Sequence, residues 1–316
     1  MSDMLNHSAK KRSLPASIAR EFRKNWGLYL LVSIPLLYLI LFKYWPMYGV
    51  QIAFRNYSPA RSIENSPWVG WKYFEKFMTN YKFRSILLNT ILISLYSLAT
   101  FPLPIVLAIL LNYVKRERFK KTVQMVSYMP HFISTVVMVG IILQFLDARS
   151  GLLNMITALF GQEAVNFIAK PEYFRTIYVF SGVWQSLGYN SIIYIAALSG
   201  VSPELHEAAI VDGANILKRI WHIDLPGIMP TISILLIMQC GSILSVGYEK
   251  IYLLQNNLNL SVSEIISTYV YKQGIAATMP QYSYATAIGL FVSVVNVVML
   301  IIVNSLSNKL SGSSLF

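Results

Sequence analysis

Residues 283–306 read SYATAIGLFVSVVNVVMLIIVNSL, a stretch without a single charged side chain. A helix needs about 20 largely apolar residues to cross the hydrocarbon core of a bilayer. The polar members of this stretch are hydroxyl and amide side chains, which can be satisfied inside a helix or between helices. The stretch therefore predicts a membrane-spanning helix near the carboxyl end of the chain.

Five comparable stretches precede it. Membrane helices tolerate the Pro and Gly within them when neighbouring groups satisfy the freed backbone atoms. We therefore expect an all-α membrane protein with about six transmembrane helices. It divides into a cytoplasmic tail (1–26), a six-helix domain (27–306) and a second cytoplasmic tail (307–316). The earlier stretches lie at approximately 27–45 (bracketed by Trp26 and Trp45), 86–111, 122–146, 176–200 and 228–248.

Composition agrees with the membrane class. Charged residues make up 13% of the chain and hydrophobic ones 55%, whereas soluble proteins carry about a quarter charged residues. The net charge of +12 is interpreted as the bias that orients membrane proteins and attracts anionic lipid headgroups. We expect no nucleic-acid partner, because no recognition module accompanies the charge. The four histidines show no metal-ligand spacing, so no metal site is predicted.

Basic residues set the orientation. The short segment from Asn112 to Lys121 holds five Lys and Arg against the single acid Glu117, which places it in the cytoplasm by the positive-inside rule. With six spans both termini are then cytoplasmic. The long segment 46–85 is also basic and runs against this assignment, but long loops weigh less in the rule. On the outer side, the apolar spacing within 151–161 predicts a short amphipathic helix at the membrane interface.

The segment 202–226 predicts two short helices that project from the membrane. Ser202 can cap the first helix, Gly213 can end it, and Pro226 is expected to stop the second before the next span. Small Ala208 and Ala209 permit close approach, while Glu207 and Asp212 offer charge. Such a unit suits docking into a groove of a partner. By its physical pattern alone it equally suits an amphipathic loop on the inner leaflet.

The same segment resembles the EAA loop of permeases from binding-protein-dependent ABC importers. The resemblance rests on Glu207-Ala208-Ala209, Asp212-Gly213-Ala214 and Leu225-Pro226. His206 departs from the family, where Tyr is frequent. Three further segments are similar to the carbohydrate-uptake, maltose-permease-like branch, and to the lipoprotein-associated oligosaccharide permeases of Gram-positive bacteria: 43–49, 127–132 and 281–287.

The resemblance implies a class I ABC importer transmembrane domain in the bacterial cytoplasmic membrane. Its partners would be a second homologous permease, a cytoplasmic ATPase dimer and an extracellular solute-binding lipoprotein. The chain lacks a Gly-x-x-x-x-Gly-Lys-Ser/Thr sequence, so ATP and Mg²⁺ would be bound by the ATPase and no cofactor by this subunit. It would not itself be an enzyme. The ATPase-coupling residues would be Glu207, Ala208, Ala209, Asp212, Gly213, Leu225 and Pro226.

Polar side chains within spans mark either packing contacts or a solute path. Amides and aromatic rings suit a neutral sugar, and the maltose-type permeases hold sugar at comparable positions. Hydrogen bonding between helices is the alternative for each residue. The candidates for the substrate path are Gln185, Tyr189, Asn190, Ser242, Ser245 and Tyr248.

Two other questions remain open from the sequence. An ion-gradient-driven secondary transporter is the alternative function; it predicts buried acids in mid-span and inverted repeats, and neither is evident. The cargo can be neutral or acidic. The basic outer residues Arg55, Arg61, Lys72 and Lys76 favour a uronide-containing oligosaccharide if they attract the substrate by charge.

Overall fold

The computed structural model describes residues 14–311 and 314–315. The basic cluster Lys10–Arg12 of the predicted amino-terminal tail lies outside these residues. Within the described part the chain is helical, and the pairing of extended segments is limited to an isolated bridge between Arg55 and Trp68. An all-helical fold is what the apolar stretches predict, because a helix satisfies its own backbone groups in lipid.

The first half of the chain forms seven α-helices with π and 3-10 turns between them. In order these are α1 (Leu14–Leu39), η1 (Ile40–Tyr44), η2 (Trp45–Phe54), α2 (Lys72–Met78), α3 (Phe83–Ala99), α4 (Pro102–Tyr113), α5 (Glu117–Tyr128), η3 (Met129–Phe132), α6 (Thr135–Phe145) and α7 (Leu152–Leu159).

The second half adds eight α-helices. In order these are α8 (Pro171–Leu198), α9 (Pro203–Val211), α10 (Ile216–Arg219), η4 (Ile220–Asp224), α11 (Leu225–Gly241), α12 (Tyr248–Leu254), α13 (Leu260–Ser263), α14 (Ile266–Gly274) and α15 (Tyr282–Ser311).

Four helices in the described chain are long and apolar enough to cross a membrane: Phe22–Phe54, Phe83–Tyr113, Ile216–Gly241 and Tyr282–Lys309. A bent pair, Glu117–Phe132 with Thr135–Phe145, makes a fifth if it forms one span. The stretch 283–306 is thus confirmed as a long apolar helix. Helix also extends into both predicted tails, since α1 begins at Leu14 and α15 runs to Ser311.

The predicted span 122–146 is not one straight helix. The helix bends by 102° between Phe132 and Thr135. Pro130 lies in the 3-10 turn before the bend, Ile133 and Ser134 are extended, and the Ser134 side chain accepts a hydrogen bond from Val137 N as the cap of α6. A Pro followed by a new amino-terminal cap is a sufficient cause of such a break.

Two more predicted spans differ in detail. The stretch 176–200 lies in α8, which has 28 residues and is long enough to span, yet it is absent from the strongly apolar set. Its polar side chains, including Gln185 and Asn190, lower its hydropathy. The stretch 228–248 does not remain helical to its end, because α11 stops at Gly241 and α12 starts only at Tyr248.

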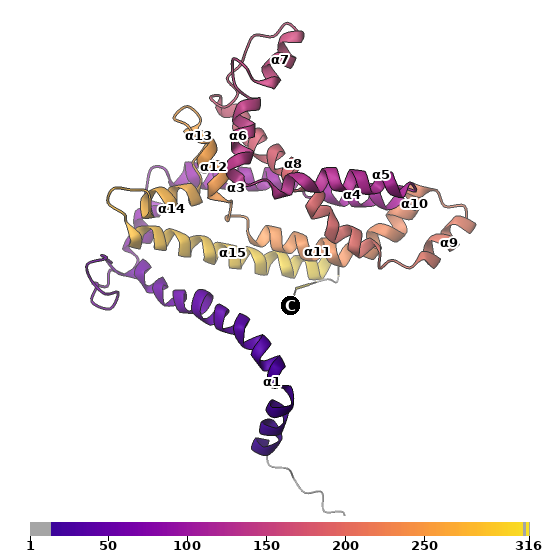
Figure 1. The fold of residues 1–316 in the computed structure, drawn as a ribbon. Helices are drawn as coiled ribbons and strands as arrows, with labels where there is room; N and C mark the ends of the chain where they lie inside the picture. The colour runs from indigo at the N-terminus through magenta and orange to yellow at the C-terminus, as the bar shows by residue number, and fades with distance from the viewer. Residues whose placement is uncertain (1–13, 312–313, 316) are drawn as a thin grey trace, which may run out of the picture.

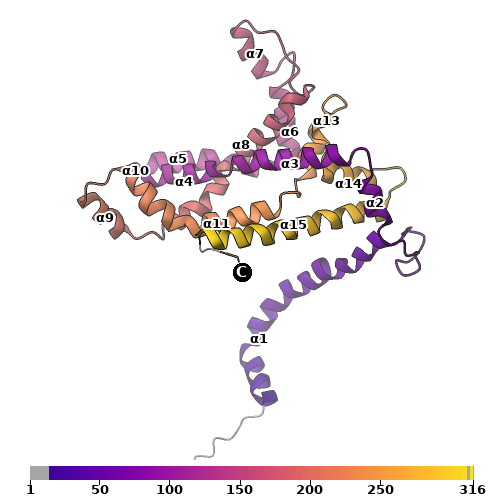
Figure 2. The same cartoon turned by 180° about the vertical axis from the view of Figure 1, so that it is seen from behind.

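The long helices lie roughly side by side in an elongated bundle (Figure 1). α9 and α10 lie at one end of it, α14 and α2 (labelled in Figure 2) lie at the other, and α7 lies beyond α6, away from the bundle. The tight basic turn 114–116 joins α4 to α5 at the α9 end, as both views show. α1 diverges from the rest along most of its length (Figure 2). The fold therefore has two distinct ends, and α1 lies apart from the bundle in both views.

Buried apolar side chains gather in separate clusters along the bundle. The cluster nearest α9 joins α4, α8 and α11 through Ile105, Ile109, Tyr194, Leu198 and Ile228. Small residues allow the closest helix contacts, as is typical of membrane bundles. At Gly188 of α8 an added Cβ would overlap the backbone of Ser127 in α5. Tyr194 of this cluster also lines the larger cavity described below.

The predicted outer amphipathic helix is present as α7, Leu152–Leu159. Leu152, Met155 and Leu159 are exposed, so an apolar face is available to an interface. The loop before it is organised by Asp147, whose carboxylate accepts hydrogen bonds from Ser150 N and Oγ. These hydrogen bonds hold the pKa of Asp147 below its usual value.

Candidate coupling loop and transport cavity

The predicted projecting loop begins with a capped helix. The Ser202 hydroxyl accepts a hydrogen bond from Glu204 N at 3.3 Å, with Pro203 in the first turn of α9. Gly213 has φ = +75°, and Ala214 N and Gly213 N donate to Ala209 O and Ile210 O at 2.8 and 3.0 Å. This pair of bonds is a Schellman motif, which requires a left-handed residue at Gly213. The predicted start and end of the first helix are confirmed.

No side chain of α9 is buried in this chain. The predicted coupling residues Glu207, Ala208, Asp212 and Gly213 are exposed, and Ala209 is half-buried. Apolar side chains accompany them: Leu205 and Ile210 are each 55% exposed and Val211 is 87% exposed. A short rigid helix with both charged and apolar side chains open to its surroundings is the geometry of a docking element.

The predicted stop at Pro226 is wrong. α10, η4 and α11 form one uninterrupted helix from Ile216 to Gly241. A Pro within a helix removes one N–H and its ring strikes the carbonyl four residues earlier. Here the turn before it is widened, so that Leu225 N donates to Ile220 O, which accommodates the ring.

Leu225 and Pro226 are placed differently from α9. Leu225 packs against the apolar cluster of α4, α8 and α11, as do Val201 and Ile220. Pro226 is exposed. Of the seven predicted coupling residues, Leu225 is the one that packs against this cluster.

A buried carboxyl lies at the base of the loop. Asp224 is fully buried, and its Oδ2 accepts a 2.6 Å hydrogen bond from the Tyr113 hydroxyl. Its Oδ1 has no hydrogen bond, and lies 3.4 Å from Nε2 of His206 in α9. The Arg219 guanidinium lies over the Tyr113 ring, 5.4 Å from its centroid. Sequence reasoning missed Asp224, although an acid entering an apolar span is a signal.

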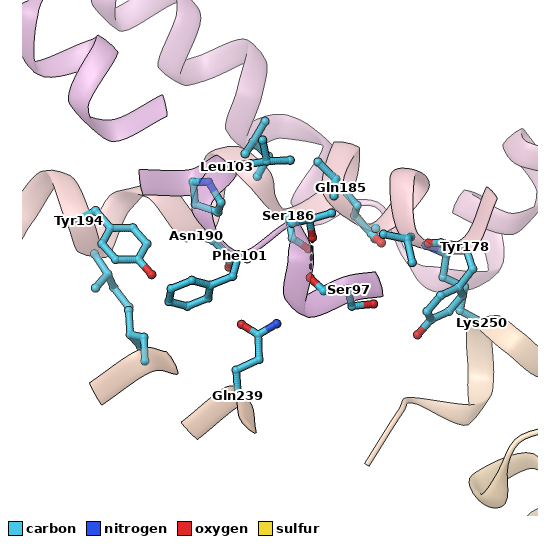
Figure 3. A pocket seen from close by; sticks show the side chains of 18 residues that line it. Ser97, Phe101, Leu103, Tyr178, Gln185, Ser186, Asn190, Tyr194, Gln239 and Lys250 are labelled. Atoms are coloured by element: carbon cyan, nitrogen blue, oxygen red, sulfur yellow. Dashed lines mark hydrogen bonds between the residues drawn. The ribbon is translucent and has the colours of Figure 1, made fainter. Parts of the chain in front are cut away.

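A polar cavity of about 480 Å³ opens between α3, α4, α8, α11 and α12. This volume falls in the usual range for small-molecule sites. Figure 3 shows Gln239 projecting from α11 toward Ser97 and Phe101 on the other side of the cavity. The wall combines amides, hydroxyls and aromatic rings, and its one charged lining residue is Lys250.

Two predicted path residues, Gln185 and Asn190, line this cavity. Gln185 also has a structural contact, since its Nε2 donates to Ile133 O at 2.9 Å. The helix break before α6 leaves the Ile133 carbonyl without a backbone donor. The Gln185 amide donates the hydrogen bond that this carbonyl needs inside a membrane protein. Gln185 therefore lines the cavity and also makes a hydrogen bond between helices.

Ser242 and Ser245 line a smaller neighbouring cavity of about 210 Å³. The two cavities share Ser97, Tyr178 and Gln239. Ser245 Oγ accepts a 2.7 Å hydrogen bond from Asn296 Nδ2 of α15. These two residues lie where α11 gives way to the non-helical segment before α12, which opens backbone and side-chain groups to the cavity.

The other two predicted path residues lie elsewhere. The ring of Tyr189 stacks on His131 with centroids 3.7 Å apart and an interplanar angle of 2°. The ring of Tyr248 stacks on Tyr271, 5.0 Å between centroids. Neither residue lines the two cavities just described. The helical spacing of the sequence could not distinguish the cavity face of α8 from its neighbouring face.

Of the four basic outer residues, two are engaged within the chain. Arg55 Nη1 donates to Glu64 O and Ser66 O at 2.8 and 3.0 Å. Lys76 Nζ donates to Gln281 Oε1 at 2.7 Å and lies over the Tyr284 ring. Arg61 and Lys72 are exposed. Part of the positive charge that was predicted to face outward thus stabilises loops.

Comparison with known proteins yields concordant matches. Residues 100–312 match the family described as "Binding-protein-dependent transport system inner membrane component". Protein LplB of Bacillus subtilis (strain 168) is 42% identical over 97% of this chain and 98% of its own length.

Two further matches bear on transport. The polygalacturonan/rhamnogalacturonan transport system permease protein YteP of the same organism is 41% identical over 97% of this chain and 94% of its length. A crystal structure of a bacterial alginate ABC transporter, in complex with an alginate pentasaccharide-bound periplasmic protein, contains a chain that is 35% identical. It aligns with a TM-score of 0.85 over 94% of this chain and 99% of that one.

Proposed function

Because this chain belongs to the family of binding-protein-dependent transport system inner membrane components, we propose that it is one of two permease subunits of an ATP-driven importer that carries an oligosaccharide across the bacterial cytoplasmic membrane. The resemblance found in the 202–226 segment is thereby confirmed. The chain is a transport subunit and not an enzyme. An ion-gradient-driven carrier has no support from these relatives.

The exposed helix α9 is the main support for the proposal that an ATPase docks on this chain. Val211, Ile210 and Leu205 leave apolar surface uncovered, while Glu207 and Asp212 provide charge on the same helix. Such a mixed surface fits a groove of a cytoplasmic protein better than it fits water alone. ATP and Mg²⁺ would be bound by that ATPase, and this subunit would hold neither.

The continuous helix from Ile216 to Gly241 suggests how docking reaches the cavity. It has 26 residues, which corresponds to about 39 Å. It begins three residues after Gly213, and Gln239 near its far end lines the cavity. A rigid helix displaced at one end moves at the other, so closure of the ATPases would shift the cavity wall as one body. Alternating access requires such rigid-body motion.

α1 supports the proposed second permease. In the span Phe22–Phe54, no residue of the most apolar window is buried within this chain, and α1 diverges from the bundle (Figure 1). Lipid covers such a helix in part, but a helix that leaves its own bundle loses all intrachain packing. A homologous subunit beside the bundle would supply that packing.

The cavity supports a sugar as cargo. Amides and hydroxyls from Gln185, Asn190 and Gln239 can meet sugar hydroxyls, and aromatic rings can stack on the apolar faces of a pyranose. Two of the similar proteins are named for polygalacturonan/rhamnogalacturonan and for alginate, both rich in sugar acids. An extracellular solute-binding lipoprotein would deliver the oligosaccharide, as a periplasmic protein accompanies the alginate transporter.

The test is to change the charge on the exposed face of α9, by adding a carboxylate in one variant and removing one in another. Val211→Glu and Glu207→Ala would be made in the complete importer. Leu159→Glu is the matched control, because Leu159 is 84% exposed and belongs to α7, a helix that lies far from α9 (Figure 1). We expect Val211→Glu to reduce co-purification of the ATPase about tenfold or more, since burying an unpaired carboxylate in an interface costs several kcal/mol. Glu207→Ala is expected to lower binding-protein-stimulated ATP hydrolysis.

The Leu159→Glu variant should keep both properties. ATPase co-purification and stimulated hydrolysis that remain unchanged in both α9 variants would refute α9 as the ATPase contact. Equal losses in the α7 control would mean that the variants perturb folding and not docking.

A further inference from the structure

Lys250 is the charged side chain of the main cavity. It belongs to α12, directly after the non-helical segment that follows α11, and it is half-buried. Figure 3 shows it beside Tyr178 at one end of the cavity. A half-buried cation that lines a cavity is costly unless it meets hydrogen-bond acceptors, a partner charge or a charged solute.

No partner charge is present in the described chain. The cavity lining contains no Asp or Glu, and the ion pairs among the described residues do not include Lys250. Its neighbour Glu249 is exposed. The ammonium group is therefore desolvated without a carboxylate to neutralise it.

Neutral groups hold the amine in place. Nζ donates to Tyr178 O at 3.1 Å and lies 5.0 Å from the centroid of the Tyr178 ring. Gly182, one turn further along α8, lies beside the amine, since a Cβ there would be in ordinary van der Waals contact with Nζ at 3.6 Å. An ammonium has three donors, so one hydrogen bond to a carbonyl leaves two available on the cavity side. The position is fixed while the charge remains unpaired.

We propose that Lys250 binds a carboxylate of the transported oligosaccharide, and that the cargo therefore contains uronic acid units. The inference rests on the proposed function and assigns the substrate class of the same cavity. A charge-assisted hydrogen bond to a carboxylate is stronger than a neutral one, and it is stronger still where water is scarce. Gln185 and Gln239 on the same cavity wall are left to bind the sugar hydroxyls.

The cavity lysine explains acidic cargo better than the outer basic segment does. Arg55 and Lys76 are already engaged by carbonyl, amide and aromatic groups of this chain, and Arg61 and Lys72 are exposed, where salt screens their charge. Outer charge can speed the approach of an acidic sugar. A desolvated lysine in the path can select for the carboxylate itself.

The experiment uses the complete importer with its binding protein in proteoliposomes loaded with ATP on the ATPase side. The probes are tetragalacturonate and tetramannuronate, together with the same tetrasaccharides after reduction of their carboxylates to primary alcohols. The variants are Lys250→Gln, Lys250→Arg and the control Lys72→Gln. ATP hydrolysis is measured in parallel as a readout of assembly.

We expect the wild type to import at least one uronate faster than its reduced form. Lys250→Gln should lower uronate import about tenfold or more, the value of a lost hydrogen bond to a charged group. It should leave import of the reduced sugar and ATP hydrolysis unchanged. Lys250→Arg should retain most uronate import, and Lys72→Gln should match the wild type.

Three results would overturn the assignment of Lys250. Equal losses for uronate and reduced sugar would mean that Lys250 only supports Tyr178 and α8. Full uronate import by Lys250→Gln would mean that the carboxylate is bound elsewhere. A wild type that imports neither uronate, or prefers the reduced sugars, while ATP hydrolysis is intact, would refute the acidic cargo and leave the importer function standing. Absence of any ATP-dependent sugar import would instead refute the proposed function.

Discussion

The Tyr113 hydroxyl donates a 2.6 Å hydrogen bond to the fully buried carboxyl of Asp224. Tyr113 is the last residue of α4, and Asp224 immediately precedes α11. The other carboxyl oxygen lies 3.4 Å from His206 in α9. One carboxyl thus connects the projecting helix, the bundle helix α4 and the long helix that reaches the cavity.

This connection predicts that Tyr113→Phe weakens coupling without removing the docking surface. The substitution leaves a buried oxygen of Asp224 without its donor, which costs about 1–3 kcal/mol. We expect a lower midpoint of thermal unfolding and a lower ratio of sugar imported to ATP hydrolysed. ATPase co-purification should persist, because the exposed face of α9 is unchanged.

Asp224→Asn is the matched comparison. It keeps an oxygen acceptor for Tyr113 and removes the acidic group, so its unfolding midpoint should fall less than that of Tyr113→Phe. A Tyr113→Phe variant that loses the ATPase altogether would show that this cluster shapes the docking surface. One that keeps full stability and full coupling would show that the hydrogen bond contributes to neither.

A second prediction concerns the end of α9. Gly213 adopts φ = +75°, a conformation that costs an L side chain about 1–2 kcal/mol. Gly213→Ala should therefore destabilise the turn and reduce stimulated ATP hydrolysis, whereas Gly213→Asn should do so less, since Asn tolerates this region. Gly140→Ala in α6 is the control: no atom lies within 4 Å of its added Cβ and its φ is ordinary, so it should be neutral or slightly stabilising. Equal effects of Gly213→Ala and Gly140→Ala would contradict the role of the left-handed turn.

Local chemistry made much of the fold predictable. Long apolar stretches such as 86–111 and 283–306 correspond to the spans Phe83–Tyr113 and Tyr282–Lys309, because hydrophobicity over 20 residues leaves few alternatives. Ser202 and Gly213 marked the ends of α9 because caps act through their own backbone neighbours. Six spans were predicted, which is more than the number of strongly apolar helices. The difference includes α8, whose cavity-lining polar side chains lower its hydropathy.

What the sequence could not reveal depended on contacts distant along the chain. At the break before α6 the Ile133 carbonyl accepts a hydrogen bond from Gln185, and one oxygen of Asp224 accepts a hydrogen bond from Tyr113, over a hundred residues away in sequence. Pro226 was expected to end a helix, but a widened turn accommodates it. Lys250 was overlooked because its position in a cavity follows from the packing of α8 against α12, which no local pattern encodes.

A third prediction separates the two roles of Gln185. Its Nε2 completes the carbonyl of Ile133, so Gln185→Ala leaves a part-buried acceptor unpaired and should destabilise the chain by about 1–3 kcal/mol. Asn190→Ala is the control, because Asn190 lines the same cavity and is exposed. Thermal unfolding should separate the two variants, whereas sugar import should be weakened in both if both face the path. An unchanged unfolding midpoint in Gln185→Ala would mean that water replaces the lost donor at the break.

The last prediction tests the packing of the long helices α11 and α15, and a second substitution is expected to restore part of the lost stability. At Gly241 of α11 an added Cβ would lie 2.6 Å from Cδ1 of Leu300 in α15, which is closer than carbon atoms pack. Gly241→Val should therefore force the two helices apart and destabilise the chain by about 1–3 kcal/mol.

Leu300→Ala alone should also destabilise the chain, by no more than about 2–5 kcal/mol, because it leaves a void beside Gly241. Together the two substitutions exchange volume across the same contact, so the double variant should be more stable than the sum of the single effects implies. Thermal unfolding of all four proteins in one detergent gives the coupling. Strictly additive effects would mean that α11 and α15 do not meet at Gly241 in the membrane, and that the helix reaching from α9 to the cavity is supported along a different face.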